Sequence, residues 1–137
     1  MDSEEKWCHE RRAEVLEYLS KEGVEHGQVS DWPAWDVYPH TSSWAIESNK
    51  SPGWVGWWVI CGDHPTDYVS AEKIKEPRYA YKAIAENWLE ICQCAEEGKK
   101  HPNMHVNLAS NELIETLRGR AKTFLEWVAD DENWQYE

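Results

Sequence analysis

The sequence predicts an α+β fold: a small antiparallel sheet of about four strands, joined as a meander, with N- and C-terminal helices packed on one face. Apolar residues recur at helical spacing near both ends of the chain, whereas the middle holds short aromatic and β-branched runs. Connections of about five residues between these runs favour antiparallel neighbours. The 137 residues fit a single domain, 1–137. We expect its acidic tail, from about residue 130, to fray.

The first helix is expected over residues 3–22. Ser3 can cap it, and acidic residues crowd its first turn, where they complement the helix dipole. Its apolar stripe contains Trp7, Val15 and Leu19. Gly23 is a natural stop. Residues 24–33 are expected to form a loop because they are rich in Gly, Asp, Ser and Pro.

Four short segments are predicted as strands: residues 35–38, 44–48, 54–61 and 67–71. The first lies between two prolines, which is typical of an edge strand. Residues 54–61 are apolar on both faces and should form the central strand, with Trp57 buried under the helices. If a hairpin pairs Ser48 with Trp54, Trp44 lies opposite Trp58 on the same face. The face without helices is either covered by long loops or left as an aromatic platform.

Two helices are expected to finish the chain. Pro77 suits a first helical position, and Gly98 ends the periodic segment that follows. Residues 99–108 are interpreted as a linker. Ser110 or Asn111 should cap the last helix. The inward-facing residues of that helix are expected to be Leu113, Leu117, Ala121, Phe124 and Val128.

The formal net charge of −12 argues against nucleic acid and anionic membranes as partners, because both require a basic footprint. A basic protein segment or a cationic small molecule remains compatible with it. The N-terminus lacks the basic and apolar regions of a signal peptide, and no apolar run approaches the roughly 20 residues of a membrane span. The four cysteines have neither zinc nor C-x-x-C spacing, so we expect inert thiols and a cytoplasmic protein. The sequence does not indicate the oligomeric state.

The predicted hairpins bring two turns, residues 39–43 and 62–66, to one end of the sheet. This end gathers imidazoles and carboxylates, which can bind a divalent metal or transfer protons. Asp beside Gly and Pro also caps turns by accepting backbone N–H bonds, so turn chemistry explains the same residues. The candidate binding residues, with no metal ligand, cofactor or catalytic residue assigned, are Trp35, His40, Asp63, His64, Asp67 and Tyr68.

Two functions follow from this pattern. In the first, the protein is a non-catalytic binding or regulatory module, of which an inhibitor or immunity-type protein is one version, with an acidic, tryptophan-rich surface. In the second, it is a small metal-assisted hydrolase whose site consists of His40, Asp63, His64 and Asp67. The sequence contains no nucleophile–base signature, which favours recognition over catalysis.

Four motifs in the first two thirds of the chain stand out: Asp31-Trp-Pro-Ala-Trp35, Trp44-Ala-Ile-Glu-Ser48, Pro52-Gly-Trp-Val-Gly-Trp-Trp58 and Gly62-Asp-His-Pro-Thr-Asp-Tyr68. Together they resemble a family of small bacterial proteins known only as a domain of unknown function. The resemblance extends from Trp7 to Trp88. It implies a bacterial, cytosolic origin and brings no established activity or site residues.

Overall fold

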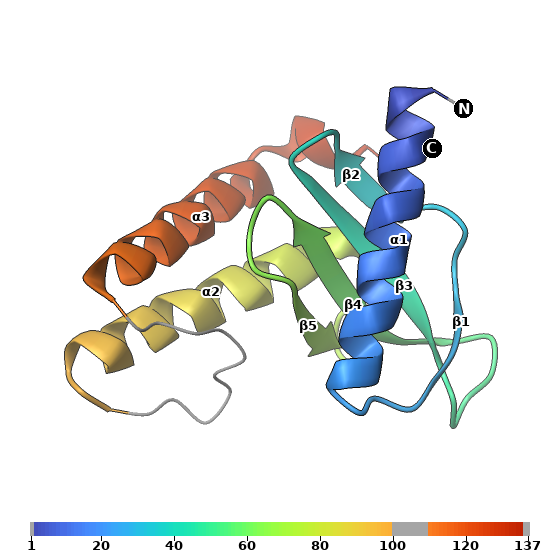
Figure 1. Ribbon diagram of the computed structural model, residues 1–137, viewed down its shortest axis with the longest axis horizontal. Coiled ribbons are helices and arrows are strands. Elements are labelled where there is room, and N and C mark those ends of the chain that lie inside the picture. Colours follow the sequence, from blue (N-terminus) through green and yellow to red (C-terminus); the bar gives the residue numbers. More distant parts are fainter. Residues whose placement is uncertain (1, 100–109, 136–137) are drawn as a thin grey trace. The chain divides into compact units, whose positions relative to one another are not determined.

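The computed structural model describes residues 2–99 and 110–135. In these residues three α-helices accompany an antiparallel sheet of five strands, which confirms the predicted α+β fold (Figure 1). The chain divides into two compact units, residues 1–77 with the first helix and the sheet, and residues 78–137 with the remaining helices. The single domain expected over residues 1–137, and the packing of the C-terminal helices on the sheet, stay predictions.

The first helix, α1, runs Ser3–Lys21 and begins after Asp2, whose carboxylate accepts the backbone N–H of Glu5 at 2.8 Å. The expectation that Ser3 is the cap is wrong by one residue, since Ser3 already lies in the helix. A carboxylate at the cap position binds an otherwise unpaired N–H and also complements the helix dipole. The predicted stop is confirmed, because Gly23 adopts a left-handed φ of 68° and donates its N–H to Ser20.

The sheet is a meander with one additional strand. Its strands are β1 (His26–Val29), β2 (Trp35–Val37), β3 (Thr41–Ser48), β4 (Val55–Gly62) and β5 (Asp67–Ser70). Strands β2 to β5 follow one another as predicted, with β4 between β3 and β5. Strands β1 and β2 share the edge of β3 that faces away from β4, β2 at the start of β3 and β1 at its end.

Strand β1 lies in a segment that was expected to be a loop, and that expectation is wrong. Its four residues, HGQV, lack an alternating apolar pattern. Its pairing with β3 is irregular, with His26 opposite Ser48 and Val29 opposite Ile46. Neither composition nor periodicity favours a strand here. The extended conformation of β1 is therefore stabilised by its pairing with β3 and not by the preferences of its own residues.

A β-bulge at Gly56 changes the pairing of β3 with β4. Near the hairpin the expected pairing holds, since Ser48 donates its N–H to the Trp54 carbonyl at 2.8 Å. Glu47 then lies opposite Val55, but Ile46 lies opposite Trp57, so Gly56 is an extra residue. A Cβ on Gly56 would lie 2.9 Å from the Cα of Ser48, a distance that favours glycine.

The bulge overturns the predicted pairing of Trp44 with Trp58. Beyond the extra residue the pairing is shifted by one, and such a shift moves side chains to the opposite face of a sheet. Trp44 therefore lies opposite Val59, and Trp58 lies opposite Ala45. Trp58 is 5% exposed and donates its indole N–H to the Ile74 carbonyl at 2.9 Å.

Helix α1 lies across one face of the sheet and closes the core of the first unit (Figure 1). Trp44, which is 0% exposed, lies in this core and donates its indole N–H to Ser42 Oγ at 2.9 Å. Trp57 packs at the edge of the core and is only half-buried, so its predicted full burial is wrong. The buried residues of this core are Val15, Leu19, Val29, Trp44, Ile46, Val59 and Cys61.

The second unit contains α2 (Pro77–Glu96) and α3 (Asn111–Ala129). Ser110 caps α3, as one of the two predicted alternatives, by accepting the N–H of Leu113 at 3.2 Å. Leu113 itself is 43% exposed, and Ile114, 6% exposed, takes the inward position in its place. Tyr81 and Phe124 meet edge-on, with ring centroids 5.0 Å apart, between the two helices.

The acidic tail is ordered over the residues that follow α3. Residues Asp131–Trp134 form a short 3-10 helix, η1, where fraying was expected. Trp134 is buried and donates its indole N–H to the Trp127 carbonyl at 2.8 Å, which holds the tail to α3. The linker expected over residues 99–108 lies, apart from Lys99, outside the described residues. No helix within the described residues has both the length and the apolar character needed to cross a membrane.

Candidate binding site

The structure brings together the two turns that were expected to meet at one end of the sheet. Thr41 at the start of β3 pairs with Gly62 at the end of β4. Beyond this pair, Asp63 donates its backbone N–H to the His40 carbonyl at 2.9 Å. The His40 Nδ1 atom lies 3.0 Å from Asp63 Oδ2, so the imidazole and the carboxylate form an exposed hydrogen-bonded pair.

Gly62 makes the contact between these turns possible. A Cβ added at this position would lie 2.1 Å from the His40 carbonyl oxygen and 2.8 Å from the Cα of Thr41. Both neighbours are backbone atoms and cannot rotate away. The close approach of the turns therefore depends on the absence of a side chain at residue 62.

The ring of His64 contacts both its own turn and the start of β3. Its Nε2 atom lies 2.7 Å from Thr41 Oγ1, and its Nδ1 atom lies 2.9 Å from the Pro65 carbonyl oxygen. A carbonyl only accepts, so Nδ1 carries the proton in this arrangement and Nε2 accepts from the threonine hydroxyl. One ring nitrogen thus contacts its own turn and the other contacts the first residue of β3.

The remaining predicted site residues lie on strands β2 and β5. Asp67 is 1% exposed at the start of β5 and accepts the backbone N–H of Tyr68 at 2.8 Å. Tyr68 is half-buried and packs edge-on against Tyr18, with ring centroids 5.8 Å apart. Trp35 is half-buried on β2, where its carbonyl accepts from Ser43 Oγ at 3.1 Å. Of the six residues, His40, Asp63 and His64 lie in the two turns, and Asp67 follows the second turn with its side chain buried.

The metal-assisted alternative has no geometric support in residues 2–99 and 110–135. No group of three or more His, Cys, Asp or Glu side chains in these residues is placed to hold one metal ion. His40 and Asp63 contact each other, and His64 contacts Thr41 and Pro65. The four residues proposed as a hydrolytic site therefore do not form a group that could hold one metal ion.

A different surface combines carboxylates with an exposed tryptophan. This surface is a hollow of about 350 Å³ at the start of α1, which we call the acidic hollow. The first turns of α1, the segment after β1 and strand β2 each contribute residues to it. Its lining consists of Asp2, Glu4, Glu5, Cys8, Trp32, Pro33 and Asp36.

The electrostatics of the acidic hollow are dominated by negative charge. Burial, with a smaller contribution from the Glu4 carboxylate, raises the pKa of Asp36. Burial also raises the pKa of the Cys8 thiol, and the carboxylates of the hollow add to that shift. None of the residues that line the hollow is basic. Within the described residues the Asp36 carboxylate has no cationic partner, so its charge is opposed by desolvation and by a like charge.

One aromatic side chain, that of Trp32, lines the hollow with these carboxylates. Trp32 is 50% exposed, and the ring of His9 lies 5.6 Å from it. Tyr38, also exposed, meets Trp7 edge-on with centroids 5.4 Å apart. Sequence reasoning missed this surface because the acids of a first helical turn are already explained by capping. The available signal was Trp32 itself, a large apolar residue between Asp31 and Pro33 in a polar segment.

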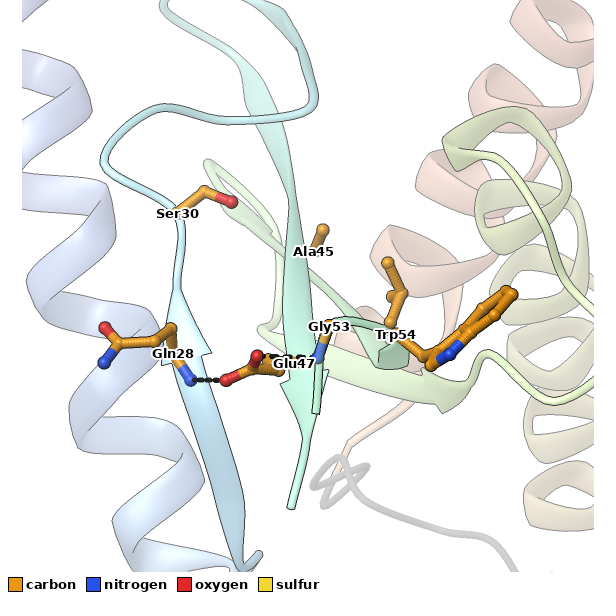
Figure 2. Close-up of a pocket in the computed structure, with 7 residues that line it drawn as sticks. Gln28, Ser30, Ala45, Glu47, Gly53 and Trp54 are labelled. Carbon is orange, nitrogen blue, oxygen red and sulfur yellow. Dashed lines mark hydrogen bonds between the residues drawn. The ribbon is translucent and has the colours of Figure 1, made fainter. Parts of the chain in front are cut away.

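A smaller hollow beside Glu47 is structural rather than a candidate site (Figure 2). The Glu47 carboxylate accepts the backbone N–H of Gln28 at 2.8 Å through one oxygen and that of Gly53 at 2.9 Å through the other. These two bonds lower the pKa of Glu47. The side chain thereby ties β1 to the β3–β4 hairpin. Trp54, 72% exposed, also lines this hollow (Figure 2).

Comparison with known sequences places the chain in a family. The chain belongs to the family described as a domain of unknown function, DUF4826, whose profile matches residues 2–134. This match confirms the resemblance carried by the four motifs and extends it over α3 and η1. No curated protein and no solved structure matches the chain significantly.

Proposed function

We propose that the protein is a non-catalytic recognition module whose acidic hollow binds a cationic side chain from a basic protein segment. The observation that carries the proposal is Asp36, a half-buried carboxylate beside Glu4 with no cationic partner in the described residues. A half-buried charge next to a like charge is costly unless a counter-charge reaches it. A lysine or arginine side chain entering the hollow supplies that counter-charge.

Trp32 gives the hollow a surface suited to a cation. Its indole is half-exposed at the rim, where an arginine or lysine head group can lie over the ring. Cation–π contacts of this kind contribute about 0.5–1 kcal/mol at exposed sites and more where water is excluded. The planar guanidinium group of arginine can stack on the indole and also donate two hydrogen bonds to one carboxylate.

The arrangement of charge favours a peptide over a small amine. Asp2 caps α1 and Glu4 and Glu5 lie in its first turn, so the negative surface extends beyond the position of Asp36. A segment with two or three basic residues can contact several of these carboxylates at once. The net charge of −12 also accelerates encounter with a basic partner at low ionic strength.

The proposal is tested by titrating the protein with peptides that contain two arginines among glycine and serine and whose termini are blocked. Isothermal titration calorimetry and NMR measure the binding. We expect binding to weaken between about 20 mM and about 200 mM salt, because the contacts are partly exposed. Peptides with citrulline in place of arginine should not bind. Chemical shift changes should centre on the Trp32 indole and on the amide of Asp36.

Two charge-matched variants locate the site. Asp36→Asn should weaken binding by about tenfold or more, because it removes the central carboxylate. Glu72→Gln, which removes one exposed negative charge elsewhere in the first unit, should have little effect. Equal losses in the two variants would show that only the overall charge matters. A loss confined to Asp63→Asn would move the site to the His40 turn. Either result contradicts the assignment.

A further inference from the structure

We infer that a second hollow, at the opposite end of the sheet from the His40 turn, binds a small zwitterion such as a free amino acid with an apolar side chain. The hollow has a volume of about 530 Å³ and we call it the aromatic hollow. It is separate from the acidic hollow, and the inference does not rest on the proposed function. It is lined by Glu22, Gly23, Val24, Glu25, Ser48, Asn49, Lys50, Gly56, Trp57, Tyr68 and Ser70.

The floor of the aromatic hollow consists of two half-buried rings on neighbouring strands. Trp57 lies opposite Ser70, and Tyr68 lies opposite Val59, so Trp57 and Tyr68 are diagonal neighbours on the face that α1 covers. The helix ends at Lys21, and the chain turns away through Gly23. Both rings therefore keep part of their surface open at this end of the sheet, where the apolar body of a ligand can pack.

The bulge at Gly56 shapes the same floor. Gly56 lines the hollow and has no side chain to fill it. The bulge also places Trp57 opposite Ile46 instead of Ala45, and so on the same face as Trp44. An uninterrupted pairing would move Trp57 to the other face and remove the largest apolar surface from the hollow.

Opposite charges enter the hollow from different segments of the chain. Glu22 and Glu25 belong to the turn after α1, whereas Lys50 belongs to the β3–β4 hairpin. The two segments touch, since Asn49 Nδ2 lies 3.4 Å from Glu25 Oε2. Within the described residues, however, Lys50 forms no ion pair with either carboxylate. The hollow thus presents a cation and two anions that do not neutralise each other.

This charge pattern selects against simple ions. A ligand that is only cationic meets Lys50, and a ligand that is only anionic meets Glu22 and Glu25. A zwitterion satisfies both sides, with its ammonium toward the carboxylates and its carboxylate toward Lys50. The volume lies within the range typical of small-molecule sites, about 300–1,000 Å³. An amino acid with an aromatic or branched side chain also covers the floor formed by Trp57 and Tyr68.

The inference is tested by NMR titration of the full chain with L-phenylalanine and L-leucine. Phenethylamine lacks the carboxylate and N-acetyl-phenylalanine lacks the ammonium, so these two compounds serve as controls. We expect the amino acids to shift the Trp57 indole and the amides of Gly23 and Gly56, and each control to bind about tenfold more weakly or worse. Equal binding of phenethylamine, or no shift with any standard amino acid, would overturn the inference.

Variants separate this site from its surroundings. Lys50→Met and Glu25→Gln should each weaken amino-acid binding by about tenfold, whereas Lys73→Met, at an exposed lysine outside the hollow, should not. Unchanged binding in Lys50→Met would overturn the inference. Asp36→Asn should leave amino-acid binding intact. The amino-acid site and the proposed peptide site can therefore be contradicted independently of each other. Circular dichroism of each variant verifies that the fold is retained.

Discussion

Replacement of Trp44 by alanine should be among the most destabilising substitutions in the first unit. The side chain is 0% exposed and lies between α1 and the sheet. Emptying such an aromatic site costs about 3–5 kcal/mol through lost transfer energy and the cavity left behind. The lost indole hydrogen bond adds little, because Ser42 Oγ can still donate to the Cys61 carbonyl at 3.2 Å. We therefore expect the free energy of unfolding to fall by about 4 kcal/mol.

The matched substitution is Trp57→Ala, two pairs along the same face. Trp57 is only half-buried at the edge of the core, so its removal should cost about 1–2 kcal/mol. Trp54→Ala removes an indole that is 72% exposed and should change stability by less than about 0.5 kcal/mol. The three variants remove an indole side chain from a buried, a half-buried and an exposed position, so they compare the cost of the same truncation at different degrees of burial.

Urea unfolding followed by far-UV circular dichroism measures these differences. With a slope of about 2 kcal/mol per M, Trp44→Ala should lower the midpoint by about 2 M and Trp57→Ala by less than about 1 M. Equal losses for Trp44 and Trp57 would refute the burial ranking and with it the shifted pairing caused by the bulge. A negligible loss for Trp44 would refute its place in the core.

Three further predictions concern single residues of the first unit. Gly62→Ala should destabilise the fold and broaden the NMR signals of His40, because a Cβ would clash with the His40 carbonyl; unchanged signals would contradict this. Glu47 has a lowered pKa in the folded state, so its stabilising effect is present at neutral pH and is lost as the pH falls through that pKa. The difference in unfolding free energy between the wild type and Glu47→Gln should accordingly vanish at low pH. A difference that persisted there would contradict the stabilising role of the two hydrogen bonds that the Glu47 carboxylate accepts. Burial raises the pKa of the Cys61 thiol to about 12, so iodoacetamide at pH 8 should label the half-exposed Cys94 in the native protein and spare Cys61 until urea is added.

Elements that depend on local chemistry were predictable from the sequence. Gly23 and Gly98 end their helices with left-handed φ angles of 68° and 71°, as the residue type suggests. Strands β2 to β5 were located by aromatic and β-branched runs between turn residues. The meeting of the His40 and His64 turns followed from hairpin connectivity alone, since antiparallel neighbours place alternate turns at the same end of a sheet.

Features that depend on tertiary contacts were not predictable. A hairpin loop fixes the pairing only beside the loop, so the extra residue at Gly56, two positions past Trp54, escapes any argument from loop length. In α3, Leu113 and Ile114 both fit a helical stripe, and only packing selects Ile114. The acidic hollow needs Asp36 of β2 beside Glu4 of α1, and no sequence spacing brings these two carboxylates together.

The bulge at Gly56 also leaves one residue of β4 without a pairing partner on β3, and this residue can compensate for a change in the length of the hairpin turn. If the turn between Ser48 and Val55 lost a residue, the chain could close it by drawing Gly56 into ordinary pairing with Glu47. The residues from Trp57 onward would keep their partners and their faces, because the change would stop at the bulge. A change in the length of this turn would therefore not shift the core residues around Trp44. The hairpin tip that carries Lys50 can differ in length between relatives while the residues of β4 from Trp57 onward keep their faces.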